Sequence, residues 1–494
     1  MCKCNCGRFA ILCIYLLCSV ISKAQFFDSL EVRTGFESRF STEKYQPLWL
    51  IANRHGTVAD RQTDLAPFIR VYNKHVIGER EVQNDRGFYD YDDITLSYGL
   101  NVYNNNHFRS TMIEEGYAKL DYKNWSFRGG RFEEDIEDID PLLSSGSLGV
   151  SSNALPIPKI GIAVTNYTNV PFTNGWLQFK GTFAHGWLGK DRYIRNSFYH
   201  EKTFFLRAGP GRLKFYGGIQ HFVEWGGERG DQKFDNSLKG FVNAFFAKET
   251  GEGGGTINRS GDQRGVLDAG LYWENDNLSL HSYIQKPFEG RHDLGFGNKN
   301  LMAGFIVSMK DRERGLQKIL VELISTKGIN ENVTATQRES YYNNNIYKTG
   351  WEYKNNIIGT PLFMNRTRAS KYFPDIQPFK WTIEDADVPA NANIINNRIL
   401  GVHTAASYSI TDMFYGRTLL TYTKNYGTIQ ESSSFATNKN QFYGLQEISY
   451  WIADKSLTIT AGIGFDHGDF SKAVGGLLGI EWNIPFRKNT SDVY

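Results

Sequence analysis

Residues 94–102 read Ile-Thr-Leu-Ser-Tyr-Gly-Leu-Asn-Val, so an apolar side chain stands at every second position. The same alternation recurs in residues 400–410, 457–465 and 478–486. Side chains of a β-strand point alternately to its two faces, so this period of two predicts strands with one apolar and one polar face. Both a soluble β-sandwich and a membrane barrel contain such strands, and periodicity alone does not separate them.

The connections between the predicted strands do separate these two classes. Short stretches rich in the Asn, Asp, Gly and Pro residues of tight turns lie at 123–124, 209–211, 275–277, 355–356, 411–412 and 453–455. Long polar connections lie between them at 133–157, 224–264, 286–299, 327–345, 366–397 and 425–440. Short periplasmic turns that alternate with long external loops are typical of outer-membrane barrels. We therefore predict an all-β fold: a transmembrane antiparallel up-and-down β-barrel of the outer membrane, with about 18 strands and long extracellular loops.

The N-terminus has the pattern of a secretory signal peptide. Lys3 and Arg8 precede an apolar run over residues 9–21, and Ala24 supplies the small residue that a cleavage site needs. We predict a signal peptide over residues 1–24, a barrel over residues 25–486 with loops folded into or over its lumen, and a polar tail over residues 487–494. All five cysteines lie inside the predicted signal, so we expect neither disulfides nor thiolate metal sites in the exported chain.

The composition argues against nucleic-acid binding and gives no sign of catalysis. The 55 Lys and Arg residues nearly balance the 53 Asp and Glu residues, whereas nucleic-acid-binding proteins usually carry a basic patch. Neither the His-Glu-x-x-His pattern of zinc proteases nor the Gly-x-Ser-x-Gly pattern of serine hydrolases is present. We therefore expect no catalytic residue, no metal site, no cofactor and no nucleic-acid partner.

The first candidate site is a run of small and polar residues over 143–159, which ends in Pro-Ile-Pro-Lys. One interpretation is an ordered loop folded into or over the lumen. The other is a constriction whose hydroxyl groups, together with the amide of Asn153, bind a sugar. We favour the ordered loop for most of the serines and retain Asn153 as a candidate glycan contact.

The second candidate site is His221-Phe-Val-Glu-Trp-Gly-Gly227. An indole beside two glycines offers a flat face on which a sugar ring can stack, and Glu224 and His221 could bind its hydroxyls. The competing interpretation is that Trp225 anchors a strand end at the membrane interface and the glycines begin a loop. We expect His200-Glu201-Lys202 to lie near this segment, which adds Lys202 to the candidate contacts.

The third candidate is the acidic run over residues 133–140. Six carboxylates in eight residues could hold a divalent cation. The spacing is not that of a calcium loop, and charge runs usually form solvated surfaces. We therefore favour a solvated loop, or pairing of these carboxylates with Arg and Lys of the lumen.

Four blocks of sequence resemble the Wzi family of capsule assembly proteins. They are, in order, Tyr45–Gly56, Ser144–Lys159, His200-Glu201-Lys202 and Glu224-Trp225-Gly226-Gly227. The resemblance implies an eighteen-stranded outer-membrane barrel that acts as a lectin and helps to anchor and organise capsular polysaccharide. Family members of enteric bacteria resemble one another in an N-terminal helical bundle that blocks the periplasmic mouth. Here residues 30–37 alternate as a strand does, so we expect the lumen to be closed in another way, for example by the 133–157 loop.

The leading hypothesis is therefore an outer-membrane lectin for capsular or extracellular polysaccharide, which is not an enzyme. The alternative is a porin or a polysaccharide-export channel, and a third possibility is a barrel enzyme that acts on lipid or glycan. The expected partners are the polysaccharide, outer-membrane lipid and the barrel assembly machinery.

Overall fold

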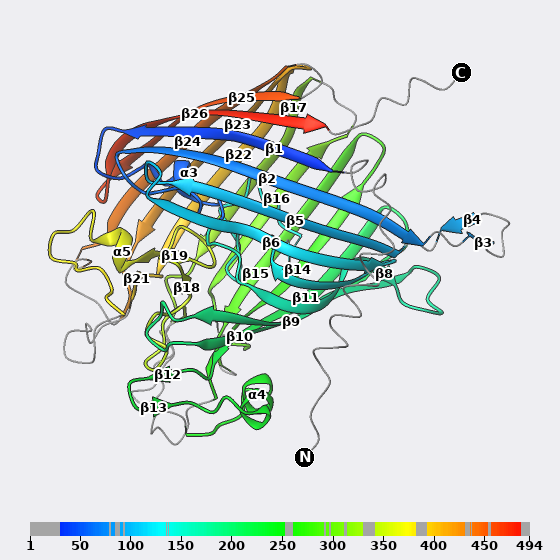
Figure 1. Ribbon diagram of the computed structural model, residues 1–494, viewed down its shortest axis with the longest axis horizontal. Coiled ribbons are helices and arrows are strands. Elements are labelled where there is room, and N and C mark those ends of the chain that lie inside the picture. Colours follow the sequence, from blue (N-terminus) through cyan, green and yellow to red (C-terminus); the bar gives the residue numbers. More distant parts are fainter. Residues whose placement is uncertain are drawn as a thin grey trace.

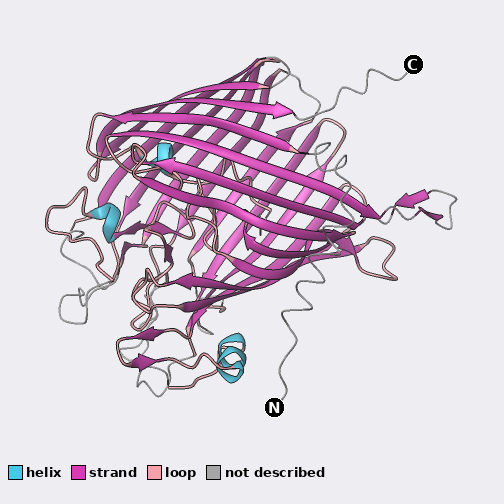
Figure 2. Ribbon diagram, viewed as in Figure 1, coloured by secondary structure: helices cyan, strands magenta, loops and turns pink. Residues whose placement is uncertain are grey.

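The wall of the molecule is one closed antiparallel barrel of 18 strands, which confirms the predicted fold class. The barrel closes because β1 pairs with β2 on one side and with β26 on the other. Figures 1 and 2 show the strands as the wall and the described helices, α3, α4 and α5, in the connections. The computed structural model describes residues 30–78, 81–83, 89–91, 94–134, 136, 138–251, 260–290, 293–295, 298–310, 314–329, 341–381, 393–429, 435, 437–452 and 456–485.

The 18 strands follow one another around the wall in chain order. Their bounds are β1 (Glu31–Ser41), β2 (Thr63–Gly78), β5 (Ile94–Asn105), β6 (Ser110–Tyr122), β7 (Trp125–Arg131), β8 (Lys159–Asn169), β9 (Leu177–Gly189), β10 (Ser197–Ala208), β11 (Leu213–Trp225), β14 (Asp262–Glu274), β15 (Leu278–Phe288), β16 (Leu301–Met309), β17 (Gly315–Ser325), β22 (Ile399–Thr411), β23 (Phe414–Asn425), β24 (Lys439–Ile452), β25 (Leu457–Gly468) and β26 (Lys472–Pro485). The predicted signal peptide, the tail over 487–494 and the turn at 453–455 lie outside the described residues. No helix of the described chain is long and apolar enough to cross a membrane.

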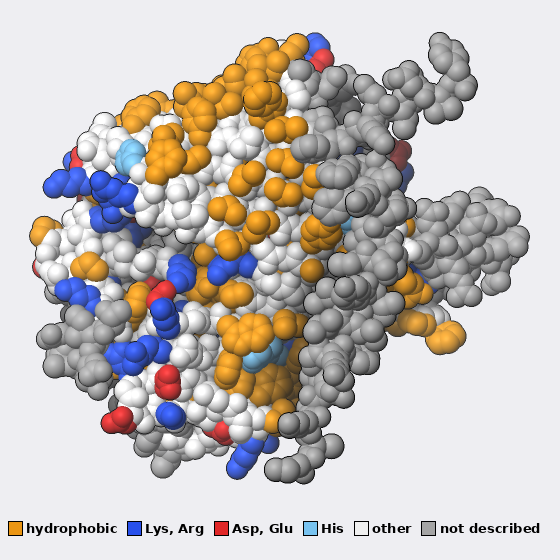
Figure 3. Space-filling view, in the orientation of Figure 1, with side chains coloured by type: hydrophobic (Ala, Val, Ile, Leu, Met, Phe, Trp, Pro, Cys, Tyr) orange, Lys and Arg blue, Asp and Glu red, His pale blue; other side chains and the backbone are white. Residues whose placement is uncertain are grey.

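The two faces of the wall differ as the period of two predicts. In β5, Leu100 is 45% exposed on the outer face, whereas its neighbour Asn101 is buried inside. In β26, Glu481 faces the lumen and pairs with Arg70 of β2, and Trp482 points outward. Figure 3 shows apolar side chains spread over the strands, while Lys and Arg side chains gather over the left half of the face, towards the long connections. The alternation therefore builds an apolar outer surface around a polar interior.

The connections also differ between the two ends of the barrel. β1 begins and β26 ends at the same end, because Glu31 pairs with Pro485. Most connections at this end are tight turns, such as those at 123–124, 275–277 and 412–413, and the long connections lie at the opposite end (left in Figure 1). Short turns mark the periplasmic end of an outer-membrane barrel, so the long connections are extracellular. A small hairpin of β3 (Glu81–Gln83) and β4 (Tyr89–Tyr91) extends one turn on the periplasmic side.

One predicted turn is wrong. Asn355-Asn356 does not join two membrane-spanning strands, because β18 (Glu352–Tyr353) and β19 (Asn356–Ile357) form a two-residue hairpin within one long connection between β17 and β22. The separate loops predicted at 327–345 and 366–397 are therefore parts of a single connection over residues 326–398. Turn chemistry is local, so a hairpin inside the lumen and a periplasmic turn have the same sequence pattern.

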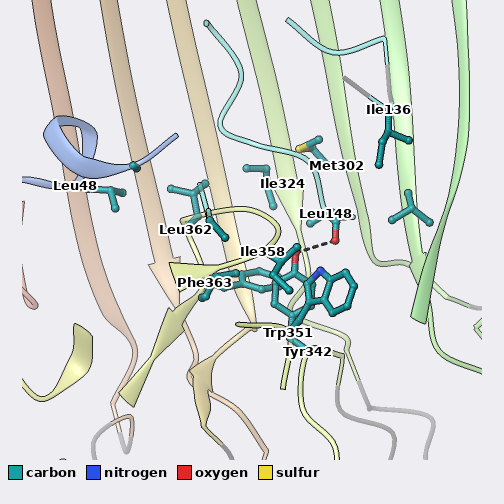
Figure 4. Packing of buried hydrophobic residues seen from close by; sticks show 14 of the residues in the cluster. Leu48, Ile136, Leu148, Met302, Ile324, Tyr342, Trp351, Ile358, Leu362 and Phe363 are labelled. Atoms are coloured by element: carbon teal, nitrogen blue, oxygen red, sulfur yellow. Dashed lines mark hydrogen bonds between the residues drawn. The ribbon is translucent and has the colours of Figure 1, made fainter. Parts of the chain in front are cut away.

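Three extracellular connections fold back into the lumen and fill it with a packed core, here called the plug. The plug comprises the described residues of 42–62, 132–158 and 341–369, including α3 (Leu48–Ile51), β20 (Met364–Asn365, paired with β21, Ile394–Asn396) and α5 (Arg366–Ala369). Its apolar side chains form one buried cluster with inward residues of the wall. Figure 4 shows Tyr342, Trp351, Ile358, Leu362 and Phe363 of the plug packed towards Leu148, with Met302 and Ile324 on the wall behind. The expectation that the 133–157 loop closes the lumen is thus confirmed in part, because two other connections share this role.

Another extracellular connection packs on the outside of the wall. It carries a two-stranded hairpin, β12 (Glu228–Arg229) with β13 (Gln232–Lys233), and α4 (Leu238–Phe245). Phe241 and Phe245 of α4 contact His200, which points outward from β10. The helix therefore covers part of the outer surface of β9–β11 (bottom of Figure 1).

Candidate functional site

The serine-rich block is a docking segment of the plug. Ser144 Oγ donates to Glu322 Oε1 of β17 (2.6 Å), and the backbone N–H of Ser145 donates to Glu322 Oε2 (2.9 Å). Further along the block, the N–H of Leu148 donates to Gln285 Oε1 of β15 (2.9 Å). Most buried polar groups are hydrogen-bonded, and the bonds made by these serines fix the block to the wall. The ordered-loop interpretation is therefore confirmed for them.

The other two plug segments hold this block in place. Asn53 Nδ2 of the 42–62 segment donates to the carbonyl oxygen of Ser144 (3.2 Å), and the 341–369 segment makes three further hydrogen bonds. Trp351 Nε1 donates to the carbonyl oxygen of Gly149 (2.7 Å), and the Tyr342 hydroxyl donates to that of Leu148 (2.8 Å; Figure 4). The N–H of Ser151 donates to the carbonyl oxygen of Ile358 (2.8 Å). The plug is therefore one hydrogen-bonded unit, although its three segments are far apart in sequence.

A cavity of about 230 Å³ lies where these segments meet on the extracellular side, and we call it the outer cavity. All three plug segments contribute to its lining, which combines four amide and four charged side chains with apolar residues and one hydroxyl group. The lining residues are Leu48, Ile51, Ala52, Gly56, Val58, Asp60, Asn153, Lys354, Asn355, Asn356, Ile357, Pro361, Phe363, Asn365, Thr367, Arg368 and Lys371.

Charged groups of the outer cavity are concentrated around Asp60. Lys371 Nζ lies 2.6 Å from the Asp60 carboxylate, and Arg368 Nη1 lies 3.7 Å from it. Burial lowers the pKa of Lys371, and Asp60 beside it acts in the opposite direction. The side chain of Asn365 accepts a hydrogen bond from the Arg368 N–H and caps α5, which fixes the backbone that carries both cations. Lys354 adds a third cation and pairs with Asp191, so cations outnumber acids in the lining.

Asn153 is the one predicted contact that lies in the outer cavity. Its Nδ2 donates to the carbonyl oxygen of Ile357 (2.9 Å), and its Oδ1 accepts from the N–H of Asn53 (3.4 Å). The side chain therefore links all three plug segments at the cavity wall.

The structure places three other predicted contacts on the outside of the barrel. Trp225, His221 and Lys202 share the outer face of β10 and β11, where Lys202 pairs in register with His221. Trp225 is only 4% exposed and packs against Phe198 and Phe241 beneath α4. The expected proximity of these two strands is confirmed, but their outward side chains form an aromatic cluster beneath α4.

Glu224 points the other way, into the barrel. Both Glu224 and Arg192 are almost fully buried, and they form an ion pair that Ser197 supports with a hydrogen bond (2.7 Å). The five predicted glycan contacts therefore do not form one pocket. Whether any of them touches a glycan remains a prediction.

The acidic run pairs largely with cations of the lumen. Glu134 contacts Arg128 and Lys159, Asp138 contacts Lys180, and Asp140 contacts Lys318. Asp135 and Glu137 lie outside the described residues. Burial would raise the pKa of Glu134, but Lys159 and Arg128 outweigh it and hold that pKa below its ordinary value. The expectation that these acids pair with lumen cations is confirmed for the three carboxylates named.

Sequence reasoning missed Asp60, Arg368 and Lys371. These residues carry no motif, and Asp60 is separated from Lys371 by 311 positions. Only the folding of two distant connections into one lumen brings them together. A weak signal was available in the turn residues Asn355-Asn356, which lie on the cavity rim.

Comparisons with known proteins agree with this architecture. The sequence pattern of the family described as "Capsule assembly protein Wzi" matches residues 28–371. The structure is similar to that of Wzi from Escherichia coli, described as a carbohydrate-binding β-barrel involved in group 1 capsule assembly, with 13% identity, a TM-score of 0.54, and coverage of 99% of this chain and 90% of that one. Pseudomonas aeruginosa OpdL (8% identity, TM-score 0.45, coverage 92% and 97%) and OpdH (10%, 0.45, 93% and 99%) are also similar. No curated protein matches the sequence.

Proposed function

Because the chain belongs to the Wzi family of capsule assembly proteins, we propose that it is a barrel lectin of the outer membrane. In this role it anchors or organises capsular or other extracellular polysaccharide at the cell surface. The apolar outer surface of the barrel agrees with an outer-membrane location. Outer-membrane lipid and the barrel assembly machinery are then its further partners, and no catalytic role is proposed.

The observation that carries this proposal is the plug. A passive channel needs a continuous aqueous path, whereas here Trp49, Tyr342 and Trp351 are buried within the lumen, in one cluster with the wall. The same three connections leave the polar outer cavity towards the extracellular side. A closed barrel with an outward polar cavity fits a binder better than the alternative, a porin or export channel.

The chemistry of the outer cavity suits an acidic polysaccharide. Sugar hydroxyls need amide and hydroxyl partners, which Asn355, Asn356 and Thr367 supply. Sugar carboxylates need cations, and Arg368 and Lys371 lie side by side on the wall of the cavity. A hydrogen bond to a charged group contributes about 1.5–3 kcal/mol. A repeating polymer can sum several such contacts along its length.

Polysaccharide binding to the purified full-length protein in detergent tests the proposal. Lys371→Gln keeps a donor for Asp60 but removes the positive charge, and we expect its affinity for the polysaccharide of the source cell to fall about tenfold or more. Lys44→Gln is the control, because Lys44 is an exposed cation of the 42–62 connection, which also carries Asp60, and does not line the cavity. Equal affinity of both variants and the wild type would exclude the outer cavity as the binding site.

A further inference from the structure

A second group of ionisable side chains lies where the plug meets the wall, away from the outer cavity. His55, Glu114 and Glu133 each offer one ligand atom, and these three atoms lie within 4.8 Å of one another. His55 Nε2 is 3.3 Å from Glu133 Oε1, and His55 Nδ1 is 4.0 Å from Glu114 Oε1. The three residues come from three different parts of the chain: the 42–62 segment, strand β6 and the 132–158 segment.

An irregularity in β6 turns two consecutive glutamates into the lumen. Neighbouring residues of a regular strand point to opposite faces. At Asn101 of β5, however, the pairing of β5 and β6 shifts register, which is the mark of a β-bulge. Glu114 and Glu115 therefore both accept hydrogen bonds from Asn101 Nδ2 (3.0 and 2.8 Å). In a regular strand the Glu114 carboxylate would point towards lipid. The bulge instead places it in the lumen, beside the plug.

The other two residues are held in place by the plug. His55 has a φ of 49°, and its N–H donates to the carbonyl oxygen of Ser152 (2.5 Å), so the loop backbone is fixed. The N–H of Glu133 donates to Glu115 Oε1 (2.8 Å), which brings the Glu133 side chain next to Glu114. The backbone of His55 and of Glu133 is therefore held in place by hydrogen bonds, the second of which is accepted by the Glu115 side chain.

The Glu114 carboxylate is buried with one oxygen unsatisfied. Glu114 is 2% exposed, and within the described part of the chain no N–H or O–H donor reaches its Oε1, beside which lies the carboxyl group of Glu133. Its ion pair among the described residues is the long contact to His55. Burying a carboxylate oxygen without a partner is costly, and a second carboxylate nearby adds repulsion. A cation between these groups would remove both costs.

We propose that His55, Glu114 and Glu133 bind a divalent cation of the zinc or manganese type. Donors that are each about 2.1 Å from one ion lie about 3–4 Å apart. Only one imidazole nitrogen can bind a given ion, and the three ligand atoms, one from each residue, lie within 4.8 Å of one another, so a small side-chain rotation brings them into that range. An imidazole nitrogen with carboxylate oxygens suits Zn²⁺ or Mn²⁺, whereas Ca²⁺ and Mg²⁺ prefer oxygen ligands alone. The ion would join two plug segments to the wall.

The site also has an open side. Glu133 and His55 keep 48% and 25% of their side-chain surface exposed. Both residues line a separate inner cavity of about 270 Å³ between the plug and the wall. Water can therefore complete the coordination sphere from this cavity. This inference concerns how the plug is held and stands independently of the proposed lectin function.

Titration of the full-length protein in detergent with Zn²⁺, followed by calorimetry, tests the proposal. We expect one ion to bind per chain, with an affinity that falls at least about tenfold in Glu114→Gln and in Glu133→Gln. Asp140→Asn is the matched control, since Asp140 belongs to the same segment but pairs with Lys318; its affinity should equal that of the wild type. If Glu114→Gln does not fold, the half-exposed Glu133 still provides the test.

Thermal unfolding in a chelator gives a second readout. Without metal, Glu114→Gln should be at least as stable as the wild type, because a neutral amide replaces a carboxyl group that is buried beside a second carboxyl group. With Zn²⁺, the wild type should become the more stable protein, since a ligand that binds only the folded state stabilises it. Zinc binding that is absent from the wild type, or equal in all variants, would overturn the proposal.

Discussion

Trp225 lies at the end of β11, and its burial there determines the effect that we expect from its substitution. Its ring is buried against Phe198, Phe241 and His185, beneath α4. The two glycines that follow have φ values of 66° and 88°, so they begin the connection in a conformation that favours glycine. The geometry thus favours packing as the main role of Trp225, and its contribution to glycan contact remains a prediction.

For Trp225→Ala we expect a loss of stability and a loosened α4. Truncation of a buried aromatic side chain costs about 3–5 kcal/mol. The unfolding midpoint and limited proteolysis near α4 would measure both effects, and polysaccharide retention per folded molecule should be measured in the same variant. A loss of retention with unchanged stability would contradict the packing role and support the glycan contact.

Glu134 gives the plug a predictable response to pH. Arg128 and Lys159 hold the pKa of Glu134 below its ordinary value near 4.5. A carboxylate whose pKa is lowered by folding adds stability above the unfolded pKa, and this stability is lost as the pH falls through the folded value. Removing one partner of a buried ion pair costs about 3–5 kcal/mol.

We therefore expect Glu134→Gln to lower the free energy of unfolding in urea at pH 6 to 7. The difference from the wild type should shrink as the pH falls below 4.5, because the carboxyl group of Glu134 then takes up a proton in the unfolded chain more readily than in the folded one. A difference that stayed constant from pH 7 to pH 3 would show that the charge of Glu134 is not what stabilises the plug.

At the level of single elements, β5 tests the register of the wall. Leu100 lies on the exposed outer face, and an Arg on the lipid face near the membrane midplane costs about 2–4 kcal/mol. Leu100→Arg should therefore be destabilising, whereas Ser97→Arg places the cation in the polar lumen and should be tolerated better. Gly99 is a poorer control, since a Cβ there would lie 2.8 Å from the Tyr117 ring. Equal unfolding free energies of the two variants would contradict the register, because a slip of one residue exchanges the faces.

The strands could be predicted because the residues of each strand alternate between apolar side chains that face lipid and polar side chains that face the lumen. Leu100 and Asn101 report lipid and lumen directly, and the same is true of Trp482 and Glu481. The strand predicted over residues 30–37 is observed as β1, over Glu31–Ser41. The Asn355-Asn356 hairpin was misassigned because its turn residues describe only the local backbone.

The candidate site was less predictable for a physical reason. Serines 144 and 145 could be assigned to an ordered loop, but their acceptor Glu322 lies 178 and 177 positions away. Asp60 and Lys371 are equally remote. Such contacts arise only when three distant connections fold into the same lumen. No periodicity or spacing in the sequence predicts that arrangement. Trp225 has the chemistry of a sugar-binding residue, but the alternation of side chains along β11 places its ring outside the barrel.

On the scale of the whole molecule, the plug decides between a binder and a channel. Glu322 receives hydrogen bonds from Ser144, Ser145 and Tyr283, so Glu322→Ala removes the acceptor that docks the serine-rich block. We expect low conductance of the wild type in planar bilayers and more frequent or larger openings in this variant. Glu274→Ala, which breaks an exposed ion pair with Lys310, should conduct as the wild type does. A large, steady conductance of the wild type would mean that the plug does not close the barrel.

The most direct test of the central claim is the division of polysaccharide between the cell surface and the medium in a strain that lacks this protein. An outer-membrane lectin predicts that total polysaccharide stays the same, that the cell-bound fraction falls, and that the wild-type chain restores it. An unchanged cell-bound fraction would contradict the lectin function. A loss of total surface and shed polysaccharide would instead indicate a role in synthesis or export.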